Sequence, residues 1–153
     1  MERIADETRP ADRGSVTVFA VIFTIGVIFL ALMLADLGNI MNAKERAADT
    51  AEQAARAAAD TLNQNELRVG NVVIDEGAAC DAADNLVAQY SNVSGIDAVI
   101  TNCQAPTLAQ PRQATVTVEV KTTPIFSALI GSFTMSATAS ACAEFGITTG
   151  AAC

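Results

Sequence analysis

The sequence predicts an α+β protein in which a long N-terminal transmembrane helix extends into a small head with a short antiparallel sheet. Three observations predict this fold. An uncharged apolar run extends from Gly14 to Ala35, an alanine-rich helical pattern follows it, and short helix and strand patterns alternate in the remainder. We therefore expect four parts: a leader (1–13), a transmembrane segment (14–36), a helical continuation (37–64) and a small α+β domain (65–153).

The apolar run is the strongest signal in the chain. As a helix it spans about 33 Å, which is enough to cross the hydrocarbon core of a bilayer. A buried core helix explains it less well, because the run is apolar on every face and a small domain has too little surface to enclose it. A cleaved secretory signal would have a shorter run before a small-x-small site, whereas Met33 is bulky where a small residue is needed.

The cysteines, rather than the basic residues, indicate the orientation of this span. Positive charges nearly balance on the two sides: Arg3, Arg9 and Arg13 precede it, and Lys44, Arg46 and Arg56 follow it. All four cysteines follow the span, and an even number can pair in an oxidising compartment. We therefore expect a single-pass protein of the cell membrane, with the N-terminus cytoplasmic and the chain after about Asn39 extracytoplasmic.

The segment after the span should continue the helix to about Leu62. Apolar residues recur there at steps of three and four, which places them on one helical stripe. Five of them define a candidate helix-packing surface, called the alanine stripe below: Ala43, Ala47, Ala51, Ala54 and Ala58. Small side chains let another backbone approach closely, so the stripe packs on a partner's helix, on the protein's own head, or on both through different faces of the helix. Glu52 and Arg56 should form an i,i+4 ion pair on the exposed side.

The remainder contains enough patterns for a small antiparallel sheet and one or two further helices. The valines of Ala114–Thr122 alternate with polar residues, which is the clearest strand pattern in the chain. The other expected elements are a short strand or irregular connection (Leu67–Ile74), a helix (Glu76–Tyr90), a turn (Ser91–Gly95), a strand (Ile96–Cys103), a short apolar helix after Pro124 (Ile125–Ile130) and an extended segment (Phe133–Phe145).

The cysteines are the candidate cross-links: Cys80, Cys103, Cys142 and Cys153. We favour Cys80–Cys103, because a helix followed by an antiparallel strand returns the chain near its start. Cys142–Cys153 would follow as the second pair, although four cysteines allow three connectivities and the others stay open. Closing a loop of this length contributes about 3 kcal/mol to the stability of a folded domain.

Composition argues against several kinds of chemistry. The net charge of −8 disfavours nucleic-acid binding, and the lack of histidine removes the commonest general base and metal ligand. Asp75, Glu76, Asp81 and Asp84 could serve acid–base chemistry or hold calcium, but favourable negative charge at a helix N-terminus explains them better. We expect no enzymatic activity, no catalytic residue, no metal, no cofactor and no small-molecule substrate.

Three stretches carry a resemblance to a known family. They are RGSVTVF at Arg13–Phe19, ADLG at Ala35–Gly38 and the alanine-rich segment 47–59. In this order and spacing they resemble the Tad (Flp) pilus-assembly proteins of the TadE/TadG-like group. The later stretches TPIF, from Thr123, and TASA, from Thr138, look like the ending common in these proteins.

The resemblance implies a minor pilin-like or accessory subunit that helps to assemble or anchor a Tad-type pilus or a related secretion apparatus. Membrane lipid, other pilin-like subunits and assembly proteins would be its partners. Some relatives are cut after a glycine by a prepilin peptidase, here between Gly14 and Ser15, while others remain as uncut anchors. The pilin pattern has glutamate at the fifth mature position, where this chain has Phe19. The alternative is a membrane-anchored extracytoplasmic module that binds a ligand or senses the envelope.

Overall fold

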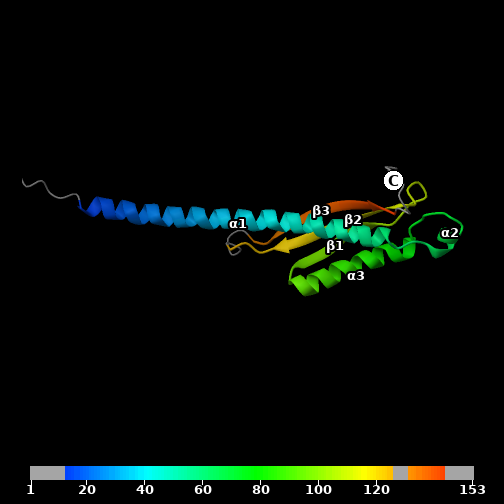
Figure 1. Ribbon diagram of the computed structural model, residues 1–153. Coiled ribbons are helices and arrows are strands. Elements are labelled where there is room, and N and C mark those ends of the chain that lie inside the picture. The colour runs from blue at the N-terminus through cyan, green and yellow to red at the C-terminus, as the bar shows by residue number, and fades with distance from the viewer. Residues whose placement is uncertain (1–12, 126–130, 144–153) are drawn as a thin grey trace, which may run out of the picture. The chain divides into compact units, whose positions relative to one another are not determined.

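A computed structural model describes residues 13–125 and 131–143 (Figure 1). The chain divides into two compact units, Met1–Ala35 and Asp36–Cys153. The second unit contains a three-stranded antiparallel sheet and helices, so the predicted α+β head is confirmed. The elements are, in chain order, α1 (Arg13–Ala59), α2 (Gln64–Arg68), α3 (Glu76–Ser94), β1 (Asp97–Gln104), β2 (Gln113–Thr122) and β3 (Phe133–Cys142).

Helix α1 contributes to both units. Its residues before Asp36 form the apolar segment, and the residues from Asp36 onward belong to the head. The helix ends at Ala59, three residues before the expected end, where the hydroxyl of Thr61 donates to the carbonyl of Ala58 at 2.6 Å. The part of the predicted continuation (37–64) that lies in α1 contributes buried side chains to the core of the head.

Of the two alternatives predicted for Leu67–Ile74, the irregular connection holds after α2, which occupies Gln64–Arg68. The strand alternative is wrong, because only Ile74 forms a single bridge, with Leu62. The side chain of Asn63 explains the helix, since it accepts hydrogen bonds from the first amides of α2 and caps its N-terminus. A local side-chain cap thus starts a short helix that no periodic pattern indicated.

Helix α3 is longer than the sequence indicated. It continues through the expected turn and ends at Ser94, because Gly95 adopts a φ of 67° and its amide donates to the carbonyl of Ser91. Glycine takes this left-handed conformation without strain, which makes it a usual helix terminator. The predicted five-residue turn is reduced to this one glycine.

The sheet has the order β1-β2-β3, and both neighbouring pairs are antiparallel. The ends of β1 and β2 lie within one residue of the predicted ends, and β3 begins at the predicted Phe133. The predicted extended segment continued to Phe145, three residues beyond the end of β3 at Cys142, and residues 144–145 lie outside the described residues. A bulge between Ile100 and Asn102 interrupts the β1–β2 register, whereas the β2–β3 register is continuous. The predicted helix after Pro124 falls largely on residues 126–130, which lie outside the described residues.

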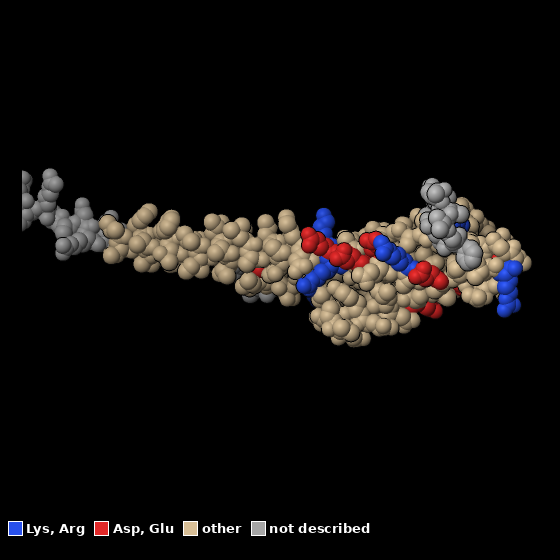
Figure 2. All heavy atoms as spheres, in the orientation of Figure 1, with Lys and Arg blue, Asp and Glu red and all other residues tan. Residues whose placement is uncertain are grey.

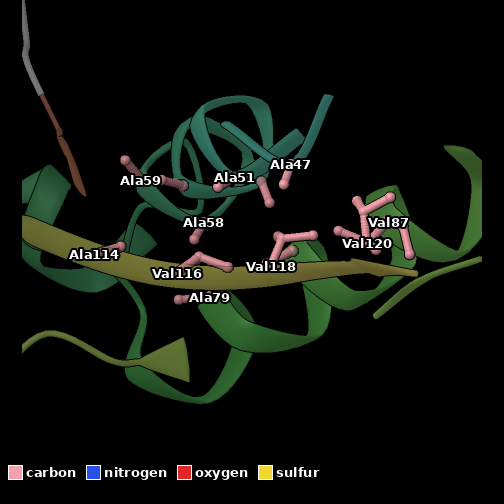
Figure 3. Packing of buried hydrophobic residues seen from close by; sticks show 14 of the residues in the cluster. Ala47, Ala51, Ala58, Ala59, Ala79, Val87, Ala114, Val116, Val118 and Val120 are labelled. Carbon is pink, nitrogen blue, oxygen red and sulfur yellow. The ribbon is translucent and has the colours of Figure 1, made fainter. Parts of the chain in front are cut away.

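One face of β2 forms the centre of the head's core. The side chains of Val116, Val118 and Val120 are almost fully buried, and Figure 3 shows alanines of α1 lying over them. Helix α3 adds its own buried side chains to the same cluster. The opposite face of β2 is polar, and Thr115 and Thr117 pair there with hydroxyls of β3. The sheet therefore has one packed face and one polar face.

Candidate functional site

The apolar segment of α1 is the first feature with a functional implication. Its large side chains are exposed, for example Phe19 at 69% and Ile22 at 65%, and Figure 2 shows the segment without the charged side chains that occur on the head. Within the described residues, this is the one helix long and apolar enough to cross a membrane. So large an exposed apolar surface needs lipid or an apolar partner, and the segment therefore suits a membrane anchor.

Asp36 marks the point where the apolar segment ends, and sequence analysis did not recognise its role. Its side chain is only 7% exposed and accepts a hydrogen bond at 2.7 Å from the backbone amide of Ile125. A charged group that is buried and accepts a hydrogen bond has a structural task, because leaving it unpaired would be costly. The signal was available: Asp36 precedes Ile40 by four residues and Ala43 by seven, so it belongs to the stripe that faces the core.

The alanine stripe packs on the protein's own head. Four of its residues are fully buried and Ala43 is 5% exposed, all within the cluster that contains the valines of β2. These five side chains are therefore buried in the protein's own head, and packing of another face of the helix on a partner stays a prediction. The physical reason is that β2 presents branched valines, which fill the space that small alanine side chains leave.

The possible processing site lies at the start of α1. The helix begins at Arg13, so Gly14 and Ser15 occupy its first turn. Phe19, at the position where pilins carry glutamate, is an exposed apolar residue. Cleavage after Gly14 remains a prediction.

A disulfide joins two elements that follow one another in the chain, α3 and β1. Cys80 of α3 and Cys103 of β1 form a disulfide with their Cα atoms 6.0 Å apart, which is the pairing that we favoured. Cys142 is also disulfide-bonded, whereas Cys153, its predicted partner, lies outside the described residues. Among the described cysteines none is free.

The acidic residues around the start of α3 have a structural explanation. The carboxylate of Asp75 caps the helix by accepting from the amides of Gly77 at 3.0 Å and Ala78 at 3.2 Å. Asp81 and Asp84 are exposed on the helix surface. No group of acidic or cysteine side chains suitable for a metal occurs among the described residues. The predicted ion pair of Glu52 and Arg56 is present on the exposed face of α1.

An open polar groove of about 490 Å³ lies between the start of the head part of α1 and the end of β2. Arg46, Asp97 and Lys121 contribute charged groups of both signs to its lining. The lining of this groove shows that the end of β2 lies beside the residues of α1 that follow Asp36.

In the part of the chain that the structure describes, fold and site define a class: a protein with one apolar helix suited to anchoring it in a membrane, and a small disulfide-containing α+β head built on the same helix. Residues 14–61 match the family described as "Putative Flp pilus-assembly TadE/G-like". Over this segment, which is less than half of its length, the chain is similar to the TadE/G-like proteins of Tad pilus assembly, and the resemblance seen in the sequence is confirmed there. Neither a curated protein nor a solved structure matches the chain.

Proposed function

We propose that this protein is a membrane-anchored accessory subunit, of the minor pilin-like kind, that helps to assemble or anchor a Tad-type pilus. The family match supports a pilus-associated role. The observation that carries the finer proposal is the use of one helix for two tasks: α1 is an exposed apolar segment before Asp36 and the core of the head after it. A head built in this way cannot separate from its anchor. The role is structural, with no catalytic step.

The surfaces available for partners follow from what the head already covers. Because the alanine stripe packs on β2, subunits of the pilus machinery would contact the exposed side chains of the apolar segment or the polar face of the sheet. In the first case, apolar helices associate side by side within the membrane. In the second case, the hydroxyl pairs of β2 and β3 offer hydrogen-bonding groups on a rigid surface.

A photo-crosslinking experiment in cells that make the pilus tests this role. A photoreactive residue replaces Ile28, which is 54% exposed, or Thr138 on the polar sheet face, and the same variants kept in the dark are the matched controls. We expect crosslinks to pilus or assembly proteins from at least one position after irradiation and none in the dark. Crosslinks to no such protein from either exposed position, in cells with assembled pili, would contradict the proposal.

The proposed orientation places the N-terminus in the cytoplasm and the head outside. The disulfide of Cys80 and Cys103 supports it, because disulfides persist in oxidising compartments. Protease added to intact spheroplasts should digest the head, and the same protease should leave it intact in inverted vesicles. N-terminal sequencing of the extracted protein then separates two forms of the proposal: a start at Ser15 indicates a processed subunit, and an intact leader indicates a permanent anchor.

A further inference from the structure

We propose that the head contacts the membrane surface through Ile125, which Asp36 holds at the level where the anchor leaves the hydrocarbon core. The occupant of this surface is lipid, at the boundary between headgroups and acyl chains. The inference rests on the membrane anchoring included in the proposed function and adds to it a second, separate contact between protein and bilayer.

Chain connectivity fixes the level of Asp36. The apolar segment from Val16 to Ala35 is about 30 Å long as a helix, which equals the thickness of the hydrocarbon core. A carboxylate is strongly disfavoured within that core. Asp36 follows Ala35 directly, so it lies at the edge of the hydrocarbon region in any anchored state.

The packing of the head brings the β2–β3 connection to the same level. In Figure 3, Ala114 and Val116 lie near Ala58, whereas Val120 lies toward Ala47, so β2 runs opposite to α1 and its end points back toward Asp36. The hydrogen bond from the amide of Ile125 to the carboxylate of Asp36, at 2.7 Å, closes this arrangement.

Ile125 has the chemistry of a residue that enters the boundary of a bilayer. Its side chain is 58% exposed although its backbone is held by Asp36, and the preceding Pro124 is buried. The backbone is thus tied to the head while the apolar side chain points away from the core. Apolar side chains at the level of the lipid headgroups partition into the acyl boundary.

The absence of tryptophan from the chain allows a clean test. The full-length variant Ile125→Trp is reconstituted into phosphatidylcholine vesicles, with or without lipid brominated near the headgroup end of its acyl chains. We expect a blue-shifted emission and loss of fluorescence with the brominated lipid. The matched control is Leu108→Trp, a fully exposed residue of the β1–β2 connection at the other end of the sheet, which should stay red-shifted and unquenched.

A third variant, Phe23→Trp, reports on the anchor itself. Quenching at position 23 without quenching at position 125 overturns the inference and leaves the anchor intact, whereas no quenching at either position overturns both. A blue-shifted but unquenched Ile125→Trp also overturns it, because a protein surface would then cover the residue.

The role of Asp36 is tested in the Ile125→Trp background. Asp36→Ala removes the acceptor of the Ile125 amide and should reduce the quenching, whereas Asp36→Asn keeps an acceptor oxygen and should preserve it. Circular dichroism of each variant shows whether the head is folded. Equal quenching in folded Asp36→Ala and Asp36→Asn would overturn the assigned role of this carboxylate.

Discussion

Alanine is the residue that makes this head possible. Ala47, Ala51 and Ala54 are fully buried in α1, and their short side chains let the helix lie close to the valines of β2. An alanine buries less apolar area than leucine or phenylalanine, so the core is thin and each side chain contributes modestly. Close packing of this kind leaves little space for extra atoms, and stability should respond sharply to added volume.

Ala51→Leu tests this packing against Ala48→Leu, which adds the same atoms on the exposed side of the same helix. We expect Ala51→Leu to lower the free energy of unfolding by about 1–3 kcal/mol through overpacking. Ala48→Leu should change it by less than about 0.5 kcal/mol. Urea unfolding of the full chain in detergent, followed by circular dichroism, measures both. Equal effects would show that α1 does not pack on β2 through this stripe.

The acidic residues near the start of α3 should also differ in how much each contributes to the stability of the head. Asp75→Ala removes the cap that accepts from two backbone amides and should lower the free energy of unfolding by about 1 kcal/mol. Asp84→Ala, on the exposed surface of the helix, should leave it nearly unchanged. The same urea titration applies. A larger loss at Asp84 than at Asp75 would mean that the carboxylates have a task other than capping.

At the scale of elements, α3 and β1 form a cross-linked unit. The disulfide of Cys80 and Cys103 joins the first part of the helix to the last part of the strand, across a sequence separation of 23 residues. It ties α3, whose buried face is mostly alanine, to the edge of the sheet. A thin core gains more from such a constraint than a large one does.

Cys80→Ala/Cys103→Ala should lower the free energy of unfolding by about 2–4 kcal/mol, because the unfolded chain regains the freedom that the loop removed. Peptide mapping without reductant should show the Cys80–Cys103 linkage in the parent protein. A reductant should destabilise the parent more than the double variant. A double variant as stable as the parent would contradict a stabilising role for this bond.

Elements were predicted well where a periodic pattern repeats and poorly where one side chain decides. Alternating valines placed β2, since a strand with one buried face has to alternate. By contrast, Asn63 begins α2 and Gly95 ends α3, each as a single capping residue. The start of α2 and the end of α3 were both missed. Asp36 was missed for a different reason: its partner is the backbone of Ile125, a residue distant in sequence and close only after folding.

At the scale of the whole molecule, α1 couples an anchor to a head. The apolar segment should decide where the protein resides, and the segment after Asp36 should decide whether the head folds. A charge placed in the apolar segment should therefore affect membrane insertion, whereas an exposed charge placed after Asp36 should not. Comparing the two variants tests whether the two parts of α1 have these separate roles.

Ile25→Arg, near the middle of the apolar segment, should disfavour membrane insertion by about 2.5–3.5 kcal/mol. Met41→Arg adds the same charge at a position of similar exposure within the head and should leave insertion unchanged. The fraction of protein that stays with membranes after alkaline extraction measures the effect. Equal retention of both variants would show that the apolar segment does not anchor the protein.

The sequence by itself determined the apolar segment, the family resemblance and the three strands, because hydrophobic length and periodicity are local properties of the chain. Only the tertiary structure decided what the alanine stripe packs against and what Asp36 binds. Both answers depend on residues far away in sequence, the valines of β2 and the amide of Ile125, which the fold brings to α1. A pattern can show that a surface is meant to be buried, but the chain has to fold before its partner is known.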